Sequence, residues 1–85
     1  MKLQELYKML QREANLEEAI GRLECESVVL SRMYHDMDVN EYIELLQRNR
    51  ESLLRARENL VIVRSTIRIY CRLHFKQKYY NELFD

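Results

Sequence analysis

The fold is decided at residues 35–42, which read His35-Asp36-Met37-Asp38-Val39-Asn40-Glu41-Tyr42. Asp38 and Glu41 have the spacing of a capping box: the Asp38 carboxylate can accept from the Glu41 backbone N–H, and the Glu41 carboxylate can reach back to the Asp38 N–H. Met37 and Tyr42 occupy the two positions of a hydrophobic staple, which sets the angle at which the chain enters a helix. A helix is therefore expected to begin at residue 39.

Few residues that would interrupt a helix occur on either side of this stretch. The 85 residues contain no proline and one glycine. We therefore predict an all-α, antiparallel, coiled-coil-like helical hairpin made of one domain, residues 1–85. Its first helix would cover about 2–34, its turn about 35–38, and its second helix about 39–82.

The second predicted helix carries a heptad repeat, the pattern of helices that pack along one stripe. One set of positions seven residues apart is Val39, Leu46, Leu53, Leu60 and Ile67, and a second set three residues later is Tyr42, Asn49, Ala56, Val63 and Tyr70. Asn49 is the polar exception. A buried Asn there would fix the register or the oligomeric state, whereas a position at the exposed edge of the stripe would explain it equally simply.

The first predicted helix is less regular. Its repeat is Leu16, Leu23 and Leu30, interleaved with Ile20, Ser27 and Tyr34, whereas the upstream apolar set is Leu3, Leu6, Tyr7 and Leu10. At about 100° per residue the two sets point in different directions. Either one helix changes its buried face near Asn15, or a short helix over 2–14 ends there and a second begins at residue 16; we favour one helix that is continuous or gently kinked. Gly21 would serve a close approach between helices, or would simply be tolerated.

The charge is balanced overall but not along the chain. Residues 1–38 hold five basic and eight acidic residues, a net charge of −3, and residues 39–85 hold nine and six, a net of +3. In a hairpin folded at residue 37, two residues lie opposite one another when their numbers add up to about 74. This register predicts three opposed pairs, Glu17 with Arg57, Glu24 with Arg50, and Glu26 with Arg48.

The chain has more apolar residues than a single stripe on each helix can use. The surplus residues, which we predict to form a dimer interface, are Val28, Val29, Leu45, Leu54, Val61, Ile62 and Ile69. The simplest arrangement is a homodimer that forms a four-helix bundle. The alternatives are a hairpin that docks on a different protein, or a monomer in which residues 2–14 fold over the open face as a third helix.

A stripe of basic and aromatic residues marks the C-terminal part of the second helix. No acidic residue occurs from residue 59 through 81. The candidate partner-binding residues are Arg64, Arg68, Arg72, Lys76, Lys78, Phe75, Tyr79, Tyr80 and Phe84. Such a stripe can grip an acidic protein surface, or can bind phosphates and stack on unpaired bases. In a third interpretation, the basic side chains cover the bundle and meet Glu5 or Glu13.

No pattern of a catalytic, cofactor or metal site stands out. Cys25 and Cys71 match no zinc or redox spacing, and a metal shared by Cys71 and His74 of two copies is a coincidence of spacing in our interpretation. No apolar run reaches the roughly 18 residues of a membrane span. We therefore expect a cytoplasmic, non-enzymatic interaction or regulatory protein that uses no cofactor and no membrane. It would act as a homodimer on a larger protein partner. The alternative is a regulator that binds nucleic acid through the same stripe, although zero net charge is unusual for one.

Overall fold

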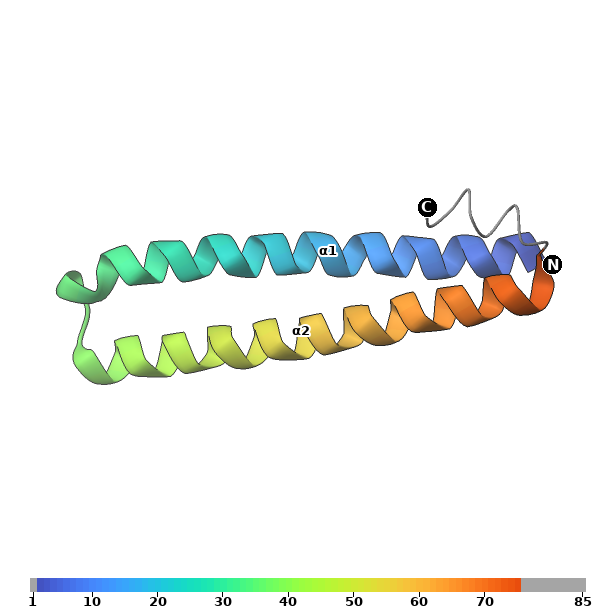
Figure 1. The fold of residues 1–85 in the computed structure, drawn as a ribbon. Coiled ribbons are helices and arrows are strands. Elements are labelled where there is room, and N and C mark those ends of the chain that lie inside the picture. The colour runs from blue at the N-terminus through green and yellow to red at the C-terminus, as the bar shows by residue number, and fades with distance from the viewer. Residues whose placement is uncertain (1, 76–85) are drawn as a thin grey trace.

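The computed structural model describes residues 2–75 and confirms an all-α helical hairpin. Helix α1 spans Lys2–Met33, a short 3-10 helix η1 spans Tyr34–Asp36, and helix α2 spans Val39–His74. The two long helices lie side by side in antiparallel directions, with the turn at one end and the N-terminus near the end of α2 (Figure 1). The molecule is a rod of 56 × 17 × 17 Å.

The turn forms as the capping pattern predicts. Asp38 is the N-cap of α2, and its Oδ2 accepts a hydrogen bond of 3.3 Å from the Glu41 backbone N–H. The first helical bond follows, from the Tyr42 N–H to the Asp38 carbonyl oxygen at 2.9 Å. The reciprocal bond to the Glu41 carboxylate is not among the hydrogen bonds of the described residues. This local motif thus starts α2 at Val39.

Helix α1 runs without interruption through Asn15, and its buried face does not change there. The inward positions alternate in steps of three and four from end to end: Leu6, Met9, Glu13, Leu16, Ile20, Leu23, Ser27 and Leu30. The expected change of face was wrong because Leu3 and Tyr7, which suggested it, are 69% and 70% exposed. Glu13 occupies one of these inward positions, so the inward row of residues continues along the whole of α1 although one of them is charged.

The stripe of α2 packs largely as the heptads predict. Its buried members are Asn49, Leu53, Ala56, Leu60, Val63, Ile67 and Cys71. Val39 is an exception and is 68% exposed, because it is the first residue of α2 beside the turn. The best-packed cluster lies at the open end, where Leu6 meets Val63, Ile67 and Cys71. Residues far apart in sequence therefore hold the termini of the hairpin together.

Helix α2 ends at His74. Phe75 has an extended backbone, with φ −129° and ψ 156°, and its N–H donates to the Cys71 carbonyl oxygen at 2.9 Å. The ring of Phe75 packs against the cluster at the open end. The part of the second helix that we expected over residues 76–82 lies outside the described residues.

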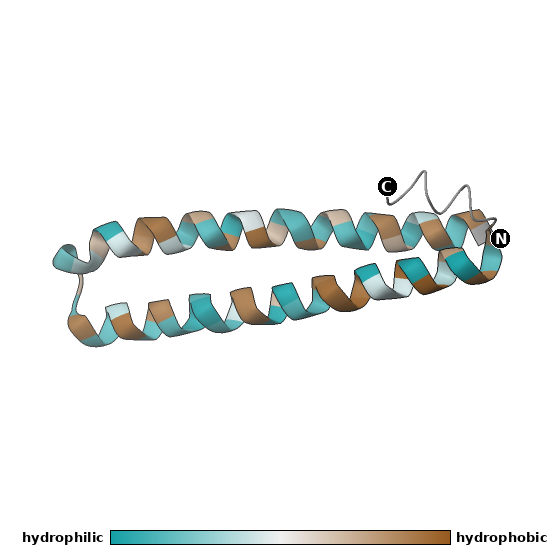
Figure 2. Ribbon diagram, viewed as in Figure 1, coloured by the Kyte–Doolittle hydropathy of each residue, from teal (hydrophilic) through white to brown (hydrophobic). Residues whose placement is uncertain are grey.

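Apolar residues also occur on the outer surfaces of both helices. Figure 2 shows apolar and polar ribbon segments alternating along α1 and α2 instead of separating into one inner and one outer side. A hairpin of two helices buries one stripe on each helix. The remaining apolar residues therefore stay in contact with solvent.

Candidate interaction surfaces

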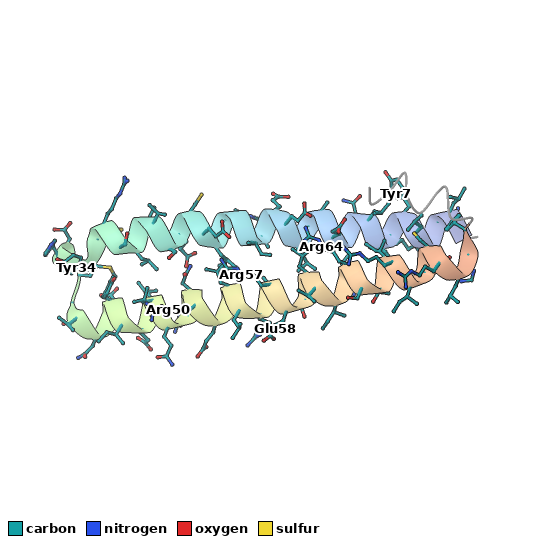
Figure 3. The ribbon with its side chains drawn as sticks, viewed as in Figure 1. Tyr7, Tyr34, Arg50, Arg57, Glu58 and Arg64 are labelled. Carbon is teal, nitrogen blue, oxygen red and sulfur yellow. The ribbon has the colours of Figure 1, made fainter. Side chains whose placement is uncertain are left out.

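Ion pairs between the helices mark one flank of the hairpin. Arg57 Nη2 lies 3.2 Å from Glu24 Oε1, and Arg64 contacts two carboxylates, Glu13 through Nε at 3.1 Å and Glu17 through Nη2 at 2.7 Å. Both arginines lie between the ribbons in Figure 3, whereas Tyr7 and Glu58 point away from the hairpin. The hydrogen bonds to Glu17 and Glu13 raise the pKa of Arg64, so its charge is held at every accessible pH.

These partners differ from the predicted ones by seven residues, about two helical turns. Arg57 pairs with Glu24 instead of Glu17, and Glu17 pairs with Arg64; the predicted partners of Glu24 and Glu26, Arg50 and Arg48, make no ion pair within the described residues. The reason is the direction of side chains, which lean toward the N-terminus of their own helix. In antiparallel helices the side chains of α1 and those of α2 lean in opposite directions along the rod. Two long side chains therefore meet when their residue numbers add up to more than the value of about 74 expected for a fold at residue 37.

Small and apolar residues border these ion pairs. Leu54 and Val61 lie one turn from Arg57 on α2, and Gly21 and Val28 lie one turn from Glu24 on α1. A Cβ added at Gly21 would meet nothing within 4 Å, so this glycine serves no close approach inside the hairpin. We call this flank the ion-pair face, defined by Ala14, Glu17, Gly21, Glu24, Val28, Leu54, Arg57, Val61 and Arg64.

The opposite flank carries a shallow groove of about 140 Å³. Its lining residues are Met9, Arg12, Asn59, Ile62, Val63 and Thr66. Heptad geometry places further exposed apolar and basic residues along the same flank. We call it the basic face, defined by Lys8, Arg12, Arg22, Val29, Arg48, Arg55, Ile62 and Ile69.

The predicted dimer residues are therefore divided between the two flanks. Val28, Leu54 and Val61 lie on the ion-pair face and are exposed. Val29, Ile62 and Ile69 lie on the basic face and are also exposed, and Leu45 on that flank is partly buried. No single contact can cover all seven.

Asn49 lies in the interior, on the side of the basic face. It is 1% exposed, and its Nδ2 donates to the Leu23 carbonyl oxygen at 2.9 Å and to Glu26 Oε1 at 3.3 Å. Its Oδ1 is buried without a hydrogen-bond partner in the described part of the chain. Of the two interpretations of this residue, the structure supports the buried one.

The predicted partner-binding residues lie in different environments. Arg64 is held by its two ion pairs, and the half-buried Phe75 packs near Tyr70, with ring centroids 6.3 Å apart. Arg68 and Arg72 are exposed on α2. Lys76, Lys78, Tyr79, Tyr80 and Phe84 lie outside the described residues. The structure thus uses part of the expected stripe for internal packing.

The two cysteines lie in different surroundings. Burial raises the pKa of the Cys71 thiol, which lowers its reactivity, whereas Cys25 is exposed. Between residues 2 and 75 no group of three His, Cys, Asp or Glu side chains could hold a metal ion, and His74 stacks on Tyr70 with ring centroids 4.4 Å apart. Neither long helix contains a stretch apolar enough to cross a lipid bilayer.

Two signals in the sequence could have revealed more of these surfaces. The first signal is the spacing of the inward residues of α1: counting back from Leu16 by three and then by four residues gives Glu13 and Met9, so the inward pattern passes through a charged residue. The second signal is a repeat of small or apolar residues every seven positions on α1, each directly after an inward residue: Ala14, Gly21 and Val28. No known protein family, curated protein or solved structure matches this chain.

Proposed function

We propose that this chain is a non-enzymatic protein–protein interaction protein that works as a helical-hairpin dimer. The supporting observation is the surface that one hairpin leaves exposed. Its accessible surface is 6916 Å², whereas a compact chain of 10.5 kDa exposes about 5,400 Å². Its radius of gyration is 17.9 Å, against about 12 Å for a compact domain of this length.

The excess is large enough for a stable interface. It amounts to roughly 1,500 Å², and a standard interface buries about 800 Å² on each partner. The excess includes large apolar side chains on the outer surfaces of both helices, among them Val28, Val29, Leu54, Val61, Ile62 and Ile69. Exposed apolar patches of more than a few hundred Å² usually mark a binding site. Association of one flank with another helical surface would bury the apolar residues of that flank.

Contact with a larger protein partner is assigned to the C-terminal part of α2. Arg68, Arg72 and Leu73 are exposed there, and they combine positive charge with apolar surface. Arginine binds carboxylates through two parallel hydrogen bonds, so an acidic protein surface is the matching partner. Nucleic acid is the alternative, with less support because the chain has zero net charge, whereas nucleic-acid-binding domains are usually strongly basic.

The dimer is tested by the mass of the chain in solution. Light scattering on a size-exclusion column, over a hundredfold range of concentration, should give twice the 10.5 kDa of one chain. A mass of 10.5 kDa at every concentration would refute the dimer.

The partner surface is tested by comparing two charge reversals. Arg68→Glu with Arg72→Glu should abolish capture of proteins that the wild-type chain binds, as identified by mass spectrometry. Arg48→Glu with Arg55→Glu makes the same change on the basic face and should leave capture intact. Equal capture by all three chains would refute the assignment to the end of α2.

A further inference from the structure

We propose that two copies of this chain pair through the ion-pair face, with Leu54 of one copy seated on Gly21 of the other. This inference rests on the proposed dimer and adds to it the face and the relative direction of the two hairpins. Its grounds are the charge, the shape and the extent of the two flanks.

The charges on and beside the ion-pair face balance within one hairpin, with three carboxylates and three arginines, of which only Arg50, seven residues before Arg57, makes no ion pair in the described residues. Arg57 is paired with Glu24, and Arg64 is paired with both Glu13 and Glu17, at distances of 2.7–3.2 Å. In a two-fold dimer the same patch meets itself, so every unmatched charge faces a like charge near the symmetry axis. A face whose charges cancel locally can approach its own copy without that repulsion.

The basic face does not meet this condition. Of its five basic residues only Arg22 makes an ion pair in the described part of the chain, with Glu18 at 3.8 Å. The other four are Lys8, Arg12, Arg48 and Arg55. Glu26 on the same flank accepts a hydrogen bond from Asn49. Two copies of this face would bring unpaired cations together, and like charges across an interface oppose association.

The shape of the ion-pair face is complementary to itself. On α1 the border of the face is low at Ala14 and Gly21, with open space at the glycine, and it rises at the exposed Val28. On α2 the border is raised, with Leu54 and Val61 exposed and seven residues apart. Residues at the same level of the two helices have numbers that sum to about 74, as those of Leu6 and Ile67 do, whereas the larger sum for Glu24 with Arg57 reflects the lean of two long side chains. Leu54 is therefore level with Gly21, and Val61 is level with Ala14.

This shape selects the direction of the second hairpin. A two-fold axis parallel to the rod places α2 of each copy over α1 of the other and keeps residues at the same level. The raised border of one copy then enters the low border of its partner, twice, with both turns at the same end. An axis perpendicular to the rod would instead place α1 on α1 and α2 on α2. The first arrangement sets Leu54 against the partner's Gly21 and Val61 against the partner's Ala14, and it makes the contacting helices antiparallel.

Two adjacent residues provide a matched test. Val61 and Ile62 are 64% and 62% exposed, and they lie on the ion-pair face and the basic face respectively. Light scattering should show that Val61→Arg lowers the mass to that of one chain, at concentrations where the wild type and Ile62→Arg remain dimeric. Circular dichroism at 222 nm checks that both variants stay helical. A wild-type dimer that survives Val61→Arg, or that is lost equally in both variants, would overturn the assignment of the face. A wild type that is monomeric throughout would instead refute the proposed dimer.

Cross-linking tests the same contact without a disruptive charge. In a Cys25→Ser background, chains carrying Gly21→Cys are mixed with chains carrying Leu54→Cys and oxidised gently. The mixed disulfide should form at least tenfold faster than with Arg55→Cys, on the basic face, in place of Leu54→Cys. Equal rates for the two mixtures would overturn the proposed contact, even if Val61→Arg had failed to fold.

Discussion

Asn49→Leu tests how the single buried amide contributes to this fold. The substitution removes a buried Oδ1 that has no partner in the described part of the chain, which should stabilise the hairpin by about 1–3 kcal/mol. Burial of the leucine side chain adds about 1.5–3 kcal/mol. Against this, loss of the bond from Nδ2 to the Leu23 carbonyl oxygen costs about 0.5–1.5 kcal/mol, and imperfect packing costs about 1–3 kcal/mol. Loss of the second bond, to Glu26 Oε1, adds little because Glu26 is exposed and its carboxylate can bond to water instead.

The central values leave a net stabilisation of about 1 kcal/mol, or a rise in Tm of about 4–8 °C for a domain of this size. Urea unfolding followed by circular dichroism, at one fixed protein concentration, measures the change. Asn59→Leu is the matched control, because Asn59 is half-buried at the edge of the groove and its replacement should change stability by less than about 0.5 kcal/mol. A loss of stability in Asn49→Leu of more than about 1 kcal/mol would refute the reasoning and would show that the two amide hydrogen bonds outweigh the unpaired oxygen.

Three further substitutions test the packing, the ion pairs and the cysteines. Ile67→Ala should destabilise the hairpin by about 2–5 kcal/mol, because Ile67 is 0% exposed within the cluster at the open end; an unchanged urea midpoint would contradict the packing. Arg64→Met should change the unfolding free energy little, because exposed ion pairs contribute little. A double-mutant cycle with Glu17→Gln should show a small coupling energy that disappears in high salt. A large coupling energy that does not depend on salt would contradict this prediction. A thiol reagent at pH 8 should label Cys25 quickly and Cys71 only on unfolding, since burial raises the pKa of the Cys71 thiol; rapid labelling of a Cys25→Ser variant would show that Cys71 is accessible.

The candidate surfaces could be predicted only in part. The sequence shows that apolar residues exceed one stripe on each helix, and it shows Arg64, Arg68 and Arg72 on one side of α2. It does not show that Glu13 and Glu17 both reach Arg64, because that contact depends on how far two long side chains lean in opposite directions. Nor does it separate Val61 from Ile62, which are adjacent in the chain and lie on different flanks.

The two helices and the turn between them follow from interactions between residues that are close together in the sequence. The Asp38 cap, the near absence of helix breakers and the repeat of apolar residues act within a few residues of one another, so they can be recognised in the sequence. The burial of Asn49, the inward place of Glu13 and the choice of ion-pair partners depend instead on how α2 is offset along α1. That offset is set by the packing of residues more than sixty positions apart, such as Leu6 and Cys71 at the open end. Such contacts exist only once the hairpin has closed.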